Sequence, residues 1–193
     1  MAATNDAELE LEIRRLGSES RADFHALMDG EEGCSWCCCV AWWVPSWEGF
    51  AERSAAENRE LREALLERGE YDGYLAYRGE TPVGWCQVGP RDRLAKLVAE
   101  HDLAPDPGAF AITCFYVRAG DRRRGVSRAL LRGVLADLER RSVARVEAFP
   151  RAEEELECGE LWTGPRSLFV EHDFRVHAEG GRRILMVREL PGG

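Results

Sequence analysis

The residues best suited to chemistry form a basic, glycine-bearing turn between an apolar segment and an amphipathic one. Residues 110–117 are a continuous apolar run, residues 122–124 are three arginines, and Gly125 and Ser127 begin a segment with helical periodicity. The start of a helix presents backbone N–H groups without internal partners, and the helix dipole favours an anion there. Three cations at that point oppose the dipole unless an anion is bound. The turn therefore indicates a site for an anionic group such as a diphosphate.

Two elements must hold this turn in place. We expect a helix over 126–141, because apolar residues recur there at helical spacing. The run 110–117 is apolar on both faces, which predicts a strand in the middle of a sheet. The turn is not a P-loop, because the lysine and the hydroxyl residue that follow the glycine of a P-loop are missing.

The other elements follow from periodicity and from turn residues. We expect strands at 8–16 and 143–149, hairpins at 74–77 with 82–88 and at 174–178 with 182–190, and helices at 18–27, 45–68, 94–98 and 166–172. Residues 151–160 are acidic and predict a surface loop. This order predicts an α/β or α+β fold with a mixed sheet and helices on its faces.

Composition limits the classes of function. The chain has 193 residues, which suits a single domain over 1–193, and its formal charge of −9 argues against a nucleic-acid partner. No segment approaches the length of apolar residues that spans a bilayer, and the start of the chain does not read as a secretory signal. We therefore expect a cytoplasmic protein whose seven cysteines are reduced thiols.

The basic turn resembles the R/Q-x-x-G-x-G/A signature of the GNAT acyltransferases. Residues 122–127 read Arg-Arg-Arg-Gly-Val-Ser, with Ser127 where the family has glycine or alanine. Residues 80–85, Glu-Thr-Pro-Val-Gly-Trp, are similar to the family's hairpin, and residues 167–174 are similar to its late helix. The similarity covers roughly 72–190, with residues 1–70 supplying the first strand and the helices on the acceptor side.

The resemblance implies a mixed, mostly antiparallel sheet that splays at its middle, with helices on both faces and the pantetheine arm of an acyl-coenzyme A in the gap. The implied activity is transfer of an acyl group, acetyl by default, from acetyl-CoA to an amine in a ternary complex, with no metal. The acceptor would be a small molecule or a peptide. Residues implied in cofactor binding are Phe115, Tyr116, Val117, Arg122, Arg123, Arg124, Gly125, Val126, Ser127, Arg128 and Phe169.

The catalytic groups do not carry over from the family pattern. The late-helix tyrosine that protonates the departing thiolate in many relatives is replaced by Phe169, and residues 110–117 contain no carboxylate. Glu147 is a lone charge in an apolar strand, and burial would raise its pKa and suit it to proton relay. An exposed charge or an ion pair is the alternative reading of Glu147. Tyr116 is a second candidate proton donor.

The acceptor side is rich in aromatic residues. Trp85 and Gln87 alternate onto one strand face and would line the acceptor pocket, although core packing is an equal alternative for Trp85. Trp36 lies in the cysteine and tryptophan segment 34–43, which would form another wall of that pocket or pack under the first helices. The C-x-x-C spacing of Cys34 and Cys37 can begin a zinc site, but no second ligand pair follows.

Two rival functions remain at this stage. One is an acyl-CoA-binding sensor that keeps the fold without turnover, and the other is a metal-binding interaction module built on the cysteines. Exposed tryptophans would favour a homodimer.

Overall fold

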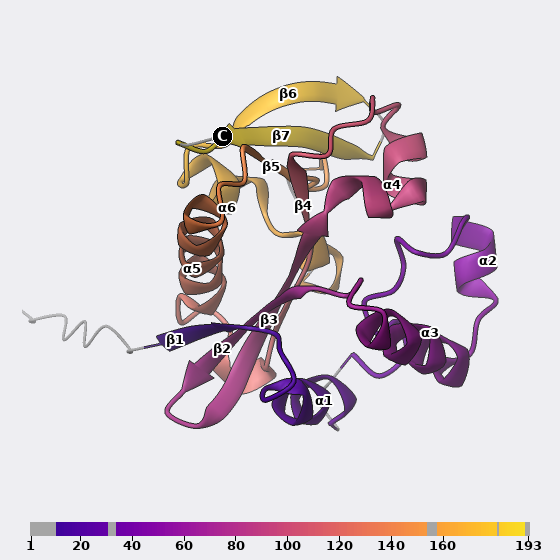
Figure 1. Cartoon of the computed structure of the whole chain (residues 1–193), viewed down its shortest axis with the longest axis vertical. Helices are drawn as coiled ribbons and strands as arrows, with labels where there is room; N and C mark the ends of the chain where they lie inside the picture. Colours follow the sequence, from indigo (N-terminus) through magenta and orange to yellow (C-terminus); the bar gives the residue numbers. More distant parts are fainter. Residues whose placement is uncertain (1–10, 31–33, 154–157, 181, 192–193) are drawn as a thin grey trace, which may run out of the picture.

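The structure is a computed structural model that describes residues 11–30, 34–153, 158–180 and 182–191. Within those residues, seven strands form one sheet in the order β1-β2-β3-β4-β5-β7-β6, and only the β4–β5 pair is parallel (Figure 1). The strands are β1 (Leu11–Arg15), β2 (Gly73–Arg78), β3 (Thr81–Pro90), β4 (Ala109–Val117), β5 (Arg145–Ala148), β6 (Arg175–Gly180) and β7 (Arg183–Glu189). The predicted mixed, mostly antiparallel sheet is confirmed.

Helices cover both faces of the sheet. The described helices are α1 (Arg21–Asp29), α2 (Trp47–Ala51), α3 (Ala55–Glu67), α4 (Ala95–Glu100), α5 (Val126–Arg140) and α6 (Arg166–Val170), with short 3-10 turns η1 (Arg91–Arg93), η2 (Ala119–Asp121) and η3 (Cys158–Thr163). Leu130 and Val134 of α5 share one core cluster with Phe169 of α6. Phe24 of α1 and Leu65 of α3 belong to a second cluster, which contains Trp85 of β3.

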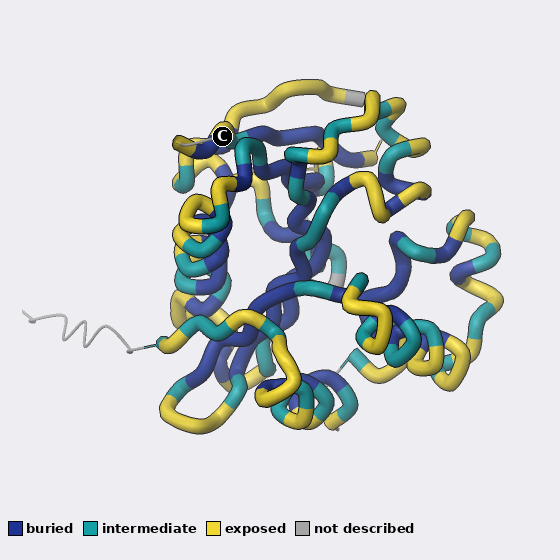
Figure 2. The backbone as a smooth tube through the Cα atoms, in the orientation of Figure 1, coloured by how far each residue is buried: buried dark blue, intermediate teal, exposed yellow. Residues whose placement is uncertain are grey.

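The two clusters leave the middle of the sheet buried on both sides. Figure 2 shows β3 and β4 buried along most of their lengths, whereas the outer surfaces of α3 and α5 are exposed. Strand β4 was predicted to be central from its apolar run, and it pairs with β3 on one edge and β5 on the other.

The helix predicted over 45–68 is two helices. Ser46 caps α2 by accepting a hydrogen bond from the Gly49 backbone, and Ser54 then starts a new helix. The Ser54 hydroxyl accepts from the Glu57 backbone N–H while the Glu57 carboxylate accepts from the Ser54 backbone, which is a complete capping box. The break follows from Ser54, whose side chain replaces the continued helix hydrogen bonds.

Strands β4 and β5 separate after a short pairing. The parallel register joins Ala109–Ile112 of β4 to Arg145–Ala148 of β5 and ends there. The remainder of β4, from Thr113 to Val117, continues to the start of α5 without β5 beside it, and η3 packs against β4 in that region. The candidate site lies in the region where the two strands have separated.

Candidate active site

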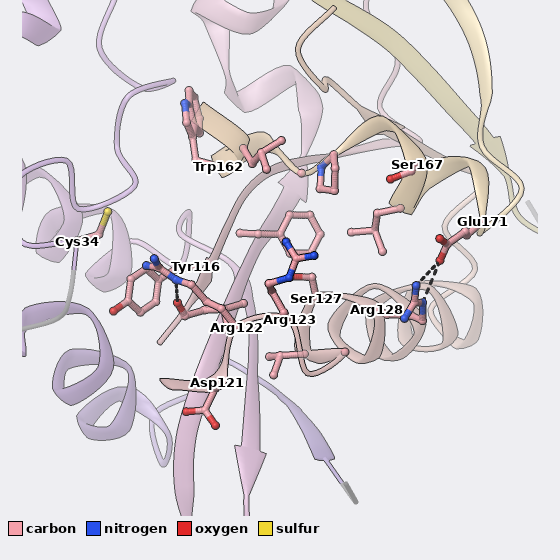
Figure 3. Close-up of a pocket in the computed structure, with 18 residues that line it drawn as sticks. Cys34, Tyr116, Asp121, Arg122, Arg123, Ser127, Arg128, Trp162, Ser167 and Glu171 are labelled. Atoms are coloured by element: carbon pink, nitrogen blue, oxygen red, sulfur yellow. Dashed lines mark hydrogen bonds and ion pairs between the residues drawn. The ribbon is translucent and has the colours of Figure 1, made fainter. Parts of the chain in front are cut away.

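A cavity of about 510 Å³ lies where β4 leaves β5 and meets the start of α5 (Figure 3). Its volume falls within the range of about 300–1,000 Å³ that is usual for small-molecule sites. Its walls come from the end of β4 and the turn after it, from the first turn of α5, from the segment between η3 and α6, and from Cys34 in the N-terminal part. The lining residues are Cys34, Phe115, Tyr116, Val117, Asp121, Arg122, Arg123, Gly125, Val126, Ser127, Arg128, Leu161, Trp162, Gly164, Pro165, Ser167, Leu168 and Glu171.

The start of α5 faces this cavity with its backbone donors. Gly125 is the N-cap, and its φ of +79° is a left-handed conformation that glycine adopts without strain. No side chain caps the helix, and the Ala129 N–H makes the first helical bond, to the Gly125 carbonyl at 2.9 Å. The N–H groups of Val126, Ser127 and Arg128 therefore have no partner inside the helix, and they form the positive end of its dipole.

One edge of β4 also faces the cavity. The Arg118 N–H donates to the Val83 carbonyl of β3 at 3.0 Å. Backbone groups alternate in direction along a strand, so those of Tyr116 point toward β3, and those of Phe115 and Val117 point toward the side that β5 has left. The N–H groups of Phe115 and Val117 on that edge are placed to pair with an extended ligand.

Asp121 fixes the turn between β4 and α5. Its carboxylate is 1% exposed and accepts hydrogen bonds from Arg78 of β2 and, at 2.8 Å, from Arg118. Burial acts to raise the pKa of Asp121, but these two arginines hold it below its usual value. The carboxylate is thus charged and bound on both sides, which orients the arginine turn toward the cavity.

An ion pair crosses the other end of the site. Arg128 of α5 donates from Nε and Nη2 to the same oxygen of Glu171, at 2.9 and 2.8 Å. Figure 3 shows this pair at the side of the cavity opposite Cys34 and Trp162.

The segment after η3 approaches β4 closely because of Gly164. Its φ is +88°, and a Cβ placed on it would lie 2.8 Å from the ring of Phe169 and 3.1 Å from that of Phe115. Any larger residue would therefore push the η3 wall away from the free edge of β4.

Most of the predicted cofactor residues line the cavity. Phe115, Tyr116, Val117, Arg122, Arg123, Gly125, Val126, Ser127 and Arg128 do so, whereas Arg124 is exposed and outside the lining. Phe169 is fully buried behind the wall and packs 6.2 Å, between ring centroids, from Phe115.

The two predicted catalytic residues lie in different places. Tyr116 lines the cavity. Glu147 is 1% exposed and lies outside the lining; its carboxylate accepts from Arg145 at 3.0 Å and is 3.7 Å from Arg91. Burial raises the pKa of Glu147, while Arg91 and Arg145 oppose that shift. Glu147 thus forms ion pairs with Arg145 of its own strand and with Arg91 of η1.

The three predicted acceptor residues also lie outside the cavity lining. Trp85 is fully buried and stacks on Tyr71 with ring centroids 5.9 Å apart. Gln87 donates to the Cys39 carbonyl at 2.9 Å and accepts from Thr113 at 3.0 Å. Trp36 is 44% exposed and donates to the Arg53 carbonyl at 3.0 Å.

Sequence reasoning missed the wall that follows β5. Leu161, Trp162, Gly164 and Pro165 line the cavity, although this part of the chain carries no motif of its own. The only local signal in this segment is the pair Gly164 and Pro165. A glycine–proline pair indicates a turn, and it does not indicate a binding site. Cys34 belongs to the segment 34–43 that was predicted to form a wall of the acceptor pocket, although the residue named for that wall was Trp36.

Within the described residues, no three His, Cys, Asp or Glu side chains are arranged to hold a metal ion. Among the described helices, none has both the length and the apolar character needed to cross a membrane.

The sheet splays between β4 and β5, and a cavity lies there at the start of the helix after β4. This is the fold that the resemblance to the GNAT acyltransferases implies. The model of the acetyltransferase (GNAT) family matches residues 36–157, and the chain belongs to this family. No curated protein matches the chain.

Solved structures agree in fold. The PaiA N-acetyltransferase from Thermoplasma acidophilum, in complex with coenzyme A, is 12% identical with a TM-score of 0.55, covering 93% of this chain and 98% of that one. The putative acetyltransferase yncA from Salmonella typhimurium, with acetyl-CoA, is 14% identical with a TM-score of 0.52, covering 95% of each chain. The ribosomal-protein-S18-alanine N-acetyltransferase from Escherichia coli is 14% identical with a TM-score of 0.50, covering 94% of each chain.

Proposed function

We propose that the protein is an N-acyltransferase that binds acetyl-CoA, or another acyl-CoA, in this cavity and transfers the acyl group directly to an amine. The observation that carries the proposal is the meeting of two sets of backbone donors in one cavity. One set is the uncapped start of α5, and the other is the free edge of β4 at Phe115 and Val117. A diphosphate fits the first, and the two amides of a pantetheine arm fit the second.

Each part of the chain would then have a distinct task. The N–H groups of Val126, Ser127 and Arg128 would hold the diphosphate, with Arg122 and Arg123 adding positive charge. The β4 edge would align the pantetheine as an added strand, which directs the thioester away from α5. Positioning of the two reactants is itself a large part of the catalysis of a group transfer.

The acceptor amine would enter at the end of the cavity formed by Cys34, Tyr116 and Trp162. These three residues lie together on the side away from Arg128 in Figure 3. Tyr116 is the lining residue whose hydroxyl can give a proton to the departing thiolate, and we assign it that role. Trp162 offers an aromatic face to a cationic or apolar acceptor.

Coenzyme A binding to a pair of variants at Gly125 tests the site. Asp and Asn are nearly isosteric, and both tolerate a left-handed conformation, so Gly125→Asp and Gly125→Asn differ mainly in charge. Isothermal titration with acetyl-CoA should give a Kd at least about tenfold weaker for Gly125→Asp than for Gly125→Asn, because the carboxylate repels the diphosphate.

Gly120→Asp is the matched control. Gly120 is exposed, has open space around it and lies outside the cavity lining, so this variant should bind like the unmodified protein. Equal Kd values for the two Gly125 variants would show that the α5 start does not hold the phosphates. Turnover is then tested by thiol release from acetyl-CoA with a panel of amines, and binding without turnover of any amine would indicate the sensor function.

A further inference from the structure

The thiols of residues 34–39 and of β4 lie in close pairs that the proposed acyl transfer does not use. Cys37 Sγ is 3.4 Å from Cys34 Sγ, and Cys39 Sγ is 3.3 Å from Cys114 Sγ. Cys38 is different, because its thiol lies 3.6 Å from the Ser35 carbonyl, to which it donates.

The backbone brings Cys34 and Cys37 together. The Cys38 N–H donates to the Cys34 carbonyl at 3.3 Å, so residues 34–38 make a single helix-like turn. The chain then changes direction at Cys38 and Cys39, whose φ angles of +45° and +51° are left-handed. Residues three apart on a helical turn lie on the same side. A disulfide has an S–S length of about 2.05 Å, so the two sulfur atoms need to approach by only about 1.4 Å.

The two pairs differ in access. Cys39 and Cys114 are buried, whereas Cys34 and Cys37 are half-buried and Cys34 lines the cavity. A soluble oxidant can therefore reach Cys34 from the cavity, and Cys37, which is outside the lining, is itself partly exposed. The neighbouring Cys34 and Cys39 thiols also lower the pKa of Cys37, and the thiolate is the form that attacks a disulfide.

We propose that Cys34 and Cys37 form a redox-active dithiol in the cavity wall, which a low-molecular-weight disulfide oxidises to an intramolecular disulfide. The Cys37 thiolate attacks one sulfur of the small disulfide and expels one thiolate. The Cys34 thiol then gives its proton to that thiolate and attacks the Cys37 sulfur, which expels the second thiolate; this one takes a proton from water. The two protein sulfurs lose two electrons, and the small disulfide gains them as two thiols.

The oxidation changes the end of the cavity at which we place the acceptor. Cys34 faces the cavity together with Tyr116 and Trp162, and its sulfur must move toward Cys37 when the bond forms. This consequence rests on the proposed function, since it concerns the acceptor end of an acyltransferase site. Oxidation should therefore change the KM for the amine more than the Kd of acetyl-CoA, whose phosphates lie at the other end.

Oxidation of the full chain by oxidised glutathione tests the dithiol. The reduced protein is incubated with oxidised glutathione, remaining thiols are alkylated, and peptides are mapped by mass spectrometry without reduction. The expected product is a peptide containing a Cys34–Cys37 disulfide and no bound glutathione. In Cys34→Ser the reaction should stop at a mixed disulfide between Cys37 and glutathione, because the resolving thiol is missing.

Cys38→Ser is the matched control, since it removes a neighbouring thiol outside both pairs and should still form the Cys34–Cys37 bond. A bond between Cys39 and Cys114 in its place, or no intramolecular bond in 34–39, would overturn the proposal. The mass readout needs no coenzyme A, so failure of the dithiol and failure of the proposed function are separate results. An unchanged amine KM in the oxidised enzyme would overturn the coupling to the acceptor end.

Discussion

Arg128 donates two hydrogen bonds to a single carboxylate oxygen of Glu171 and so joins the first turn of α5 to the end of α6 across the cavity. Both side chains are about half exposed, at 58% and 47%. An ion pair of this exposure contributes only about 0–1 kcal/mol to stability. The ion pair acts mainly on the site. The guanidinium of Arg128 is already hydrogen-bonded to Glu171, and Glu171 adds a negative charge near the start of α5.

Glu171→Gln should therefore tighten coenzyme A binding. Removal of the charge frees Arg128 for the ligand phosphates, and we expect the Kd of acetyl-CoA to fall about three- to tenfold at low salt, with a smaller change at high salt. Isothermal titration at two salt concentrations measures this. Arg128→Gln is the opposite control and should weaken binding; a weaker Kd in Glu171→Gln would contradict this role for the pair.

A second prediction separates Tyr116 from Glu147 as the group that moves a proton. Tyr116→Phe keeps the ring in the cavity wall and removes the hydroxyl, so kcat should fall by at least about a hundredfold while the KM for acetyl-CoA changes little. Glu147→Gln should keep kcat within about threefold, because Glu147 is buried between Arg91 and Arg145 outside the cavity lining. The reverse pattern in steady-state kinetics would assign the proton transfer to Glu147.

The burial of Lys96 should make the stability of the folded protein depend on pH. Lys96 is the only lysine in the chain, and its Nζ lies 3.6 Å from the ring centroid of Trp47, buried and without a hydrogen-bond partner among the described residues. Burial lowers its pKa to about 8, with Glu100 opposing the shift. Between about pH 8 and pH 10.5 the unfolded chain then binds more protons at Lys96 than the folded chain, so this residue makes stability rise with pH.

The comparison is with Lys96→Met, which keeps the length of the side chain and cannot titrate. From about pH 8 to about pH 10, the unmodified protein should gain up to about 2 kcal/mol of unfolding free energy relative to the variant. Urea denaturation at the two pH values measures the difference. If the unfolding free energies of the two proteins changed equally between the two pH values, Lys96 in the folded chain would titrate like a solvated amine.

The capping box of α3 gives a stability prediction. Ser54→Ala removes the hydroxyl that accepts from the Glu57 backbone and should cost about 1 kcal/mol. Ser18→Ala is the control, because the first helix was predicted to begin at residue 18 but its N-cap is Ser20. Urea midpoints should fall for Ser54→Ala and stay within error for Ser18→Ala. Equal midpoints in the two variants would show that the α2–α3 break does not depend on this cap.

Local patterns were sufficient to predict most of the elements and the glycine-bearing turn before α5. The apolar run of β4, the amphipathic helix α5 and Gly125 between them were all predicted from neighbouring residues. The reason is that helix periodicity and the unpaired amides of a helix start are properties of a few consecutive residues. The break at Ser54 was also local in origin, and it was missed because the polar sequence on both sides favours a helix.

The surroundings of individual side chains could not be predicted from local sequence patterns. Glu147 was assigned because it is a lone charge in an apolar strand, and Trp85 was assigned from strand alternation. Neither pattern shows what packs against the side chain. Arg91, from a different element, reaches Glu147, and Tyr71 stacks on Trp85. Each partner is distant in sequence, so only the folded chain decides that these residues lie outside the cavity.

The sequence by itself therefore determined the family, the order of elements and the half of the cavity built by β4 and α5. Tertiary structure decided which residues form the other half, where Cys34, Tyr116 and Trp162 line the cavity. The first half is made of backbone groups whose direction follows from local conformation. The second depends on side chains that are 46 to 128 residues apart, which line one cavity only when the sheet brings their segments together.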